Sequence, residues 1–349
     1  MARMSRARTV AGHLLLVSVL TSCGSAPAPS ELTSAAPSLA ASAPPPSDGS
    51  PPSSAPELTE PGLRAHIRPE ALEAHLRALQ DLADDPGAGS NRATGSPGFT
   101  ASSAYVASVL ADAGYDVTRQ EFMIGDVVSS NLLVERAGGG SGVVMLGAHL
   151  DSVAVGPGMN DNGSGVAALL VLATALTELP APSATVRFAF WGGEEGGPFG
   201  SQAYVDTLEP AALARIRAYL NVDMIGSPNA VTFVYDEPGA APGSNALRNV
   251  IVGYFARHGL PWDPIDLEGD SDHGPFIAAG VPTGGLFAGG IEPVTEAQAA
   301  RFGAVAGEPA DACSHAACDT IENVDVATLK FMTDVIAAAL VALAAATAG

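Results

Sequence analysis

The chain has 349 residues, among them 37 acidic and 16 basic side chains, and a formal net charge of −21 at pH 7. This balance argues against a nucleic acid partner, because a basic surface supplies most of the affinity for phosphate backbones. It agrees with binding of cations or of substrates that have an ammonium group, although a requirement for solubility alone would also explain it.

Three arginines within the first eight residues precede an apolar stretch over 14–20. The stretch is too short to span a bilayer, which predicts a signal peptide over residues 1–22. The sequence Leu20-Thr21-Ser22-Cys23 resembles the lipobox of bacterial lipoproteins, so we expect cleavage before Cys23 and lipidation of its sulfur. An ordinary secretory signal is the alternative.

Residues 23–61 are almost all Ala, Ser and Pro, with too little apolar surface to offset the entropy of ordering. We therefore expect a disordered tether there, followed by one domain over residues 62–349. This organisation predicts a monomeric, exported lipoprotein of the cell envelope or cell surface that contacts the membrane only through its lipid. Release into the medium is the alternative.

Apolar periodicity predicts the helices and strands of this domain. Pro69 and helical spacing of leucines predict a helix over 69–82, and similar patterns predict helices over 98–113 and 165–179, the last capped by Ser164. Runs of β-branched and large apolar residues predict strands over 116–122, 131–135, 142–150, 184–191 and 219–225. The apolar segment 335–347 is too short for a membrane span and is expected to pack in the core. The alternation predicts an α/β sandwich whose functional residues follow the strands of a largely parallel sheet.

Polar side chains with metal-binding chemistry follow two of these strands. His149 and Asp151 end the strand 142–150, and the Asp151 carboxylate is placed to accept a hydrogen bond from the imidazole and select its tautomer. Glu194 and Glu195 follow the strand 184–191, where adjacent carboxylates repel each other unless a cation is near. A satisfied histidine at the sheet edge and a solvated pair of glutamates are the alternatives.

Three further candidates lie elsewhere. Asp161 precedes a strongly apolar helix, where a capping turn is the alternative role. Asp223 lies in a segment otherwise suited to the core, so its charge must be paired or coordinated. His315 lies between Cys313 and Cys318, which we expect to form a disulfide in an oxidising compartment and to stiffen the loop; an incidental histidine is the alternative.

Two imidazoles and three carboxylates suit zinc better than calcium or magnesium. Five ligands exceed the needs of one tetrahedral ion. A shared carboxylate would allow two ions, which in such sites are roughly 3.5–4 Å apart, and Glu194 would remain as a general base.

Seven stretches of the chain closely resemble the secreted co-catalytic zinc aminopeptidases, in particular the Streptomyces-type leucine aminopeptidases. Five of them are Gly147-Ala148-His149-Leu150-Asp151-Ser152-Val153, Asn160-Asp161-Asn162-Gly163-Ser164-Gly165, Trp191-Gly192-Gly193-Glu194-Glu195, Asn221-Val222-Asp223-Met224-Ile225-Gly226-Ser227 and Cys313-Ser314-His315-Ala316-Ala317-Cys318. The other two are Asn91-Arg92-Ala93-Thr94-Gly95-Ser96-Pro97-Gly98 and Ser271-Asp272-His273-Gly274-Pro275-Phe276. The resemblance implies a three-layer α/β sandwich with a mixed, mostly parallel central sheet, of the zinc-exopeptidase or phosphorylase/hydrolase-like fold.

The resemblance also implies two Zn²⁺ per chain, with His149 and Asp223 on one ion, Glu195 and His315 on the other, and Asp161 bridging them. It makes Glu194 the general base and acid in removal of the first residue from peptides or proteins with a free N-terminus. Members of the family favour large apolar first residues such as Leu, Phe or Met. Met224 and Phe287 are therefore expected to line the substrate pocket.

The chain departs from the family at two positions. Ser314 replaces a tyrosine that stabilises the oxyanion, so we expect either slow turnover or substitution by another group such as His273. Lys330 stands where some relatives have a calcium ligand, so we expect no calcium. The rival functions are a single-zinc acyltransferase like the glutaminyl cyclases, a carboxypeptidase or dipeptidase, and a non-catalytic surface binding module.

Overall fold

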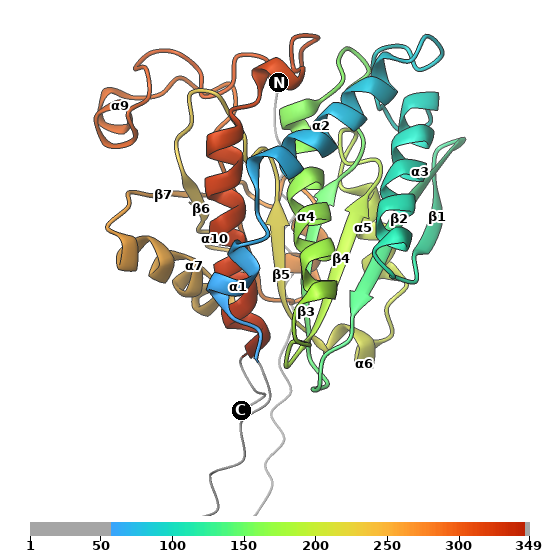
Figure 1. The fold of residues 1–349 in the computed structure, drawn as a ribbon, viewed down its shortest axis with the longest axis vertical. Helices are drawn as coiled ribbons and strands as arrows, with labels where there is room; N and C mark the ends of the chain where they lie inside the picture. The colour runs from blue at the N-terminus through green and yellow to red at the C-terminus, as the bar shows by residue number, and fades with distance from the viewer. Residues whose placement is uncertain (1–56, 346–349) are drawn as a thin grey trace, which may run out of the picture. The chain divides into compact units, whose positions relative to one another are not determined.

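The structure is a computed structural model that describes residues 57–345 (Figure 1). The predicted signal peptide, the lipidated Cys23 and all but the last residues of the predicted tether lie outside the described residues. They stay predictions.

A single eight-stranded sheet forms the centre of the domain, in the strand order β1-β2-β4-β3-β5-β8-β6-β7. The strands are β1 Thr118–Ile124, β2 Val127–Arg136, β3 Val143–His149, β4 Thr185–Trp191, β5 Ile216–Val222, β6 Phe233–Tyr235, β7 Asp263–Ile265 and β8 Thr283–Phe287. The central strands β4, β3, β5 and β8 are parallel, as are β6 and β7. Antiparallel pairing joins β1 to β2, β2 to β4 and β6 to β8. The predicted mixed, mostly parallel sheet is confirmed.

Helices cover both faces of the sheet. They are α1 Glu60–Arg64, α2 Pro69–Asp84, α3 Pro97–Asp112, α4 Ser164–Glu178, α5 Phe199–Asp206, α6 Pro210–Leu213, α7 Ser244–His258, α8 Gly274–Ala278, α9 Glu296–Phe302 and α10 Val326–Ala345, with short turns η1 Met159–Gly163 and η2 Ile321–Asn323. Figure 1 shows α2, α4 and α10 together in front of the sheet. Tyr204 of α5 and Phe276 of α8 pack on the opposite face, so the predicted three layers are confirmed.

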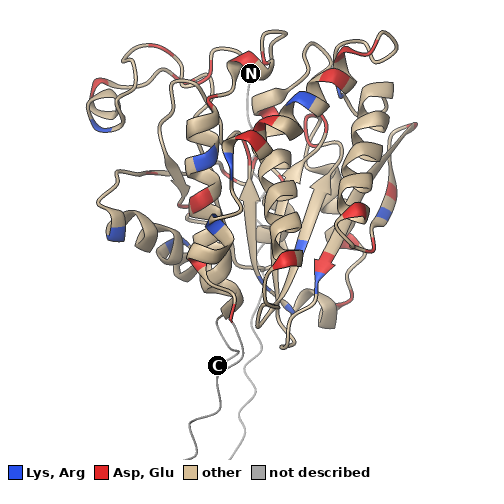
Figure 2. Cartoon of the chain, in the orientation of Figure 1, with Lys and Arg blue, Asp and Glu red and all other residues tan. Residues whose placement is uncertain are grey.

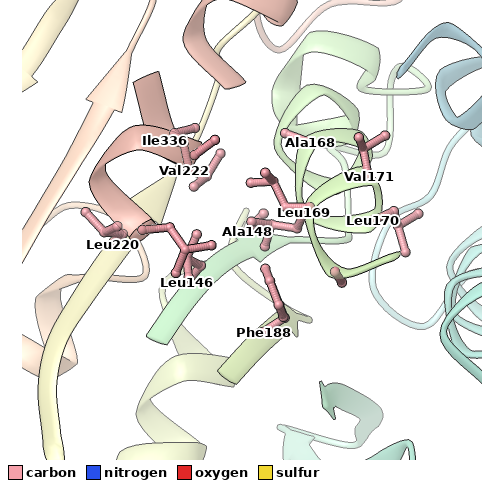
Figure 3. Packing of buried hydrophobic residues seen from close by; sticks show 14 of the residues in the cluster. Leu146, Ala148, Ala168, Leu169, Leu170, Val171, Phe188, Leu220, Val222 and Ile336 are labelled. Atoms are coloured by element: carbon pink, nitrogen blue, oxygen red, sulfur yellow. The ribbon is translucent and has the colours of Figure 1, made fainter. Parts of the chain in front are cut away.

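Alternating strand residues supply the two hydrophobic cores. Leu146 of β3, Phe188 of β4 and Leu220 of β5 point toward Leu169 of α4 and Ile336 of α10 (Figure 3). Their neighbours along the strands point the other way, where Trp191 and Tyr219 pack with the aromatic rings of α5 and α8. Burial on both faces explains why these strands are continuous apolar runs.

Most predicted elements are present with shifted ends. The strands expected over 116–122, 131–135, 142–150, 184–191 and 219–225 correspond to β1 to β5, and the helices over 69–82, 98–113 and 165–179 to α2, α3 and α4. The predicted cap of α4 is wrong: Gly163 is the N-cap residue, and Ser164 Oγ donates to Asn160 O at 2.6 Å. The later short elements were not predicted, because β6 and β7 have three residues each and β8 contains two glycines.

The first and the last helix of the domain each start earlier than expected. Helix α1 starts at Glu60 and is capped by Thr59, so the folded domain starts before residue 62. Helix α10 starts at Val326 instead of residue 335. By length and hydropathy α10 would be able to cross a membrane, but 61% of its most apolar window is buried. Within it, Lys330 Nζ lies 2.8 Å from Asp334 Oδ2, which also contacts Arg64.

A partly buried histidine in α2, His75, predicts a pH dependence of stability. Burial lowers the pKa of His75 from 6.5 to about 4, and its Nδ1 lies 2.7 Å from the Tyr105 hydroxyl. Between pH 6.5 and about 4, the unfolded chain binds a proton at His75 that the folded chain does not. The free energy of unfolding therefore decreases as the pH is lowered. Between pH 7.5 and 5.0 this histidine should cost about 2 kcal/mol of unfolding free energy.

Chemical denaturation at the two pH values should show that His75→Gln removes this part of the pH dependence. His258→Gln, at the exposed end of α7, is the matched control. An unchanged pH dependence in His75→Gln would contradict the assignment.

Candidate metal centre and active site

The five predicted metal ligands and Glu194 lie at one edge of the sheet. His149 is the last residue of β3, Glu194 and Glu195 follow β4, and Asp223 follows β5. These three strands are parallel neighbours, with His149 in register with Trp191, so their carboxyl ends meet at the same level. Acidic residues are spread over the domain, including the loops beyond these strand ends (Figure 2).

Asp161 lies between the two histidines. Its Oδ1 is 3.2 Å from His149 Nε2, and its Oδ2 is 3.2 Å from His315 Nε2. His149 Nε2 also lies 3.4 Å from Asp223 Oδ1, whereas His315 Nε2 lies 3.3 Å from Glu195 Oε2. The distances therefore divide the residues into two groups that share Asp161.

A buried carboxylate that we did not predict positions Asp161. Asp319 accepts hydrogen bonds from the backbone N–H groups of Asn160, at 2.8 Å, and Asp161, at 2.9 Å. The Cys313–Cys318 disulfide is present, as predicted, with 5.2 Å between its Cα atoms. Because Asp319 directly follows Cys318, one segment positions both the bridging carboxylate and the His315 loop. The position of Asp319 next to Cys318 is the feature of the sequence that could have identified it.

Asp151 differs from its expected role. The hydrogen bond to His149 Nδ1 involves the Asp151 backbone carbonyl, at 3.1 Å, while its carboxylate is 3.8 Å away. The carboxylate instead accepts from the backbone N–H groups of Glu194 and Glu195, at 3.2 and 3.4 Å, and from the Thr94 hydroxyl. Asp151 thus positions the two glutamates, and its carbonyl selects the histidine tautomer.

Two more residues outside the predicted set support the site. Ser271 donates to Asp223 Oδ2 at 2.9 Å and accepts from Asn221 Nδ2 at 3.0 Å. Arg92 is fully buried and donates to Pro157 O at 2.8 Å and to the carbonyls of Leu150 and Gly158. Burial lowers the Arg92 pKa to about 10. Both residues lie in stretches that resemble the family, which was the available sequence signal, but no role was predicted for either.

Carboxyl groups in the site repel one another. Burial raises the pKa of Glu195 to about 8, and the neighbouring Asp161 adds to this shift. Burial also raises the pKa of Asp272 to about 8. The pKa of Glu194 is raised well above its usual value by burial, with further contributions from Asp272 and Asp223. Bound cations would offset this accumulation of negative charge.

The imidazoles of His149 and His315 offset only part of the negative charge of these carboxyl groups. Burial favours the neutral form of Asp161, but hydrogen bonds from His149 and His315 outweigh it and lower the Asp161 pKa. The bond to Asp161 raises the pKa of His315 to about 9. Protons therefore occupy nitrogens that a metal ion would otherwise use, so metal binding would release them.

The residues present fit a metal ion. Ligand atoms of His149, Asp161 and Glu195 all lie within 4.8 Å of one another. Among residues 57–345, the buried Glu195 Oε1 has no hydrogen-bond partner, and the same holds for Asp223 Oδ1. Orphaned carboxylate oxygens beside imidazoles are the nitrogen and oxygen donors that zinc prefers.

Of the three residues predicted for the substrate pocket, Met224 and Phe287 lie together, whereas His273 is enclosed elsewhere. Met224 and Phe287 both face Gly290, where a Cβ would lie 3.9 Å from Met224 Cε and 3.4 Å from Phe287 Cζ. His273 differs from expectation, because its ring is 0% exposed and its Nε2 lies 2.5 Å from Glu237 Oε1. A fully enclosed imidazole cannot line the pocket or replace the missing tyrosine. Ser314 Oγ lies 4.0 Å from Met224 Sδ.

Comparison with known families gives one match. The sequence model described as Peptidase family M28 matches residues 131–340. The chain is also similar to curated proteins. It is 41% identical to leupeptin-inactivating enzyme 1 of Streptomyces exfoliatus over 79% of this chain and 62% of that protein. It is 43% identical to a probable lipoprotein aminopeptidase of Mycobacterium tuberculosis over 54% of this chain and 40% of that protein. The chain thus spans less than two thirds of the length of either relative.

Solved structures share the fold. A zinc aminopeptidase from Bacillus subtilis is 26% identical, with a TM-score of 0.54 over 63% of this chain and 51% of that one. A glutaminyl cyclase from an Acidobacteriales bacterium is 20% identical, with a TM-score of 0.63 over 86% of this chain and 99% of that one. Aminopeptidases and glutaminyl cyclases therefore share this fold, and the fold by itself does not distinguish the two activities.

Proposed function

The chain belongs to peptidase family M28, and from this membership we propose that it is a dizinc aminopeptidase that removes large apolar first residues from peptides. The observation with the most weight is the shared position of Asp161, 3.2 Å from an imidazole on either side. A carboxylate between two histidines, each with a second carboxylate, is the donor set of a two-metal site.

We assign His149 and Asp223 to one zinc ion, Glu195 and His315 to the other, and Asp161 to both. When bound, the two ions would supply an acidified water and would polarise a carbonyl. The neutral imidazoles required for this are oriented by backbone contacts, such as that of Asp151 O with His149 Nδ1 at 3.1 Å.

Glu194 is proposed to transfer the proton. Its side chain is 16% exposed, in contrast to the 1% exposed His149, so it can reach a substrate. Its backbone N–H is bound to Asp151 Oδ1 at 3.2 Å, which fixes the start of the side chain. The carboxylate takes a proton from the attacking water and gives it to the leaving amine.

Met224 and Phe287 are proposed to bind the apolar side chain of the first residue. With Ser314 in place of a tyrosine and His273 enclosed, the oxyanion has no such donor from these two residues. Loss of one oxyanion donor costs about two to three orders of magnitude in rate in a well-studied hydrolase, so we expect slow turnover. We also propose that the protein is exported and anchored through Cys23, in line with the lipoprotein relative.

An assay of the purified full chain tests this function. We expect hydrolysis of leucine p-nitroanilide, two zinc ions per chain by elemental analysis, loss of activity with 1,10-phenanthroline and recovery with added zinc. N-acetyl-leucine p-nitroanilide is the matched control and should not be cleaved. Activity that survives the chelator would contradict the proposal.

The same preparation separates the rivals. A peptide with N-terminal glutamine should keep an uncyclised N-terminus. One zinc per chain and a cyclised N-terminus would instead identify an acyltransferase like the glutaminyl cyclases. Cleavage of the acetylated substrate would indicate a peptidase that does not require a free N-terminus. Absence of turnover with every substrate would favour a non-catalytic binding module.

A further inference from the structure

A groove of about 340 Å³ lies beside the candidate metal centre and is lined by Ile124, Val127 and Phe199 together with Asp151 and Glu195. We call it the hairpin groove, because Ile124 and Val127 are the pair that closes the β1–β2 hairpin. Its volume is at the lower end of the range for ligand pockets, about 300–1,000 Å³. A groove of this size suits one side chain of a longer ligand.

Two exposed apolar side chains line the hairpin groove. Val127 and Phe199 are each 42% exposed, whereas Met123 and Val128 pair one position along and lie on the other face of the hairpin. A single exposed apolar side chain is normal, but apolar side chains that line a groove together with polar groups are typical of a binding site. The ligand group that the hairpin groove binds is therefore apolar.

The wall of the hairpin groove contacts the loops of the metal centre. Gly95 and Gly193 have φ values of 83° and 82°, and a Cβ at either position would collide with Val127 or Ile124, respectively. Gly95 follows Thr94, which donates to Asp151 Oδ2 at 3.2 Å, and Gly193 immediately precedes Glu194. The hairpin is thus packed directly on the backbone that positions the proposed proton carrier.

The strand order places the hairpin groove on one side of the metal centre and the expected first-residue pocket on the other. The candidate ligands follow β4, β3 and β5. Phe287 ends β8, the neighbour of β5, whereas the hairpin groove is formed by the β1–β2 hairpin next to β4. A peptide that crosses the metal centre therefore has an apolar surface before and after it.

We propose that the hairpin groove binds the side chain of the second residue of the substrate and selects large apolar residues there. This inference rests on the proposed aminopeptidase function. If the first residue of the substrate lies at Met224 and Phe287 and the scissile bond lies beside Glu194, the rest of the substrate peptide continues toward β4 and β2. The leaving part of the peptide then reaches the hairpin groove, and specificity depends on two consecutive residues.

Dipeptide amides test the proposal. The full chain loaded with zinc should hydrolyse leucyl-phenylalanine amide and leucyl-leucine amide with a kcat/KM about tenfold or more above that of leucyl-glycine amide, since even one methylene group in a hydrophobic pocket changes kcat/KM by about 10–200-fold. In Phe199→Ser and in Val127→Ser the ratio of the phenylalanine to the glycine substrate should fall about tenfold. Both residues are partly exposed, so both variants should fold.

Val305→Ser is the matched control, because Val305 is 59% exposed in the loop after α9, and its ratio should equal that of the wild type. A wild-type ratio near one, or equal ratios in all variants, overturns the subsite but leaves the proposed function standing. Absence of hydrolysis of all three amides in the wild type overturns both. If the wild type is a dimer that Phe199→Ser dissociates without changing the ratio, the surface around Phe199 is an interface between two copies, and the subsite is again overturned.

Discussion

A Glu194→Gln variant is expected to lose about two to four orders of magnitude in kcat on leucine p-nitroanilide while it still binds two zinc ions per chain. The amide preserves the shape of the carboxyl group but can neither accept a proton from water nor give one to the leaving amine. Zinc binding should persist, because His149 Nε2 is 3.9 Å from Glu194 Oε2 but 3.2 Å from Asp161 Oδ1. Steady-state kinetics and elemental analysis of the same samples measure both quantities.

Glu209→Gln is the matched control, since Glu209 is exposed at the start of α6 and should not affect kcat. If Glu194→Gln lost zinc in parallel with activity, Glu194 would be a metal ligand instead of the proton carrier. A kcat within tenfold of the wild type would exclude general-base catalysis by this residue.

Asp161→Asn is expected to weaken binding of both zinc ions by about two to four orders of magnitude, because removing one partner of a buried charged group costs about 3–5 kcal/mol. The two Asp161 oxygens lie 3.2 Å from His149 Nε2 and 3.2 Å from His315 Nε2, so one substitution affects both groups. The amide has no net charge to offset two cations. Competition with a chromogenic chelator measures the affinities.

Thermal unfolding provides a second measurement for the same variant. Zinc at a hundredfold excess over its dissociation constant should stabilise the wild type by about 2.7 kcal/mol per site, and Asp161→Asn should lose most of this gain. Asp116→Asn, at an exposed aspartate before β1, is the matched control. Two zinc ions bound to Asp161→Asn with wild-type affinity would show that Asp161 does not bridge them.

The candidate site was largely identifiable from local patterns. A histidine at the end of a buried strand and an aspartate inside an apolar segment are unusual enough that their positions alone suggested coordination, as with His149 and Asp223. The positioning residues were not identifiable in this way. Ser271 lies in a stretch that resembles the family, but neither it nor Asp319 had a predicted role. Their roles arise from hydrogen bonds to residues 48 and 158 positions away.

The sequence by itself determined the central strands, the main helices and the chemical identity of the site, because periodicity and donor chemistry are local properties of the chain. Only the tertiary structure decided how these residues act together. The order β4-β3-β5 brings three strand ends to one level, which places Asp161 between two histidines, encloses His273 and sets the β1–β2 hairpin beside Glu195. Such distances depend on strand pairing and side-chain packing between segments far apart in the chain, and no local pattern encodes them.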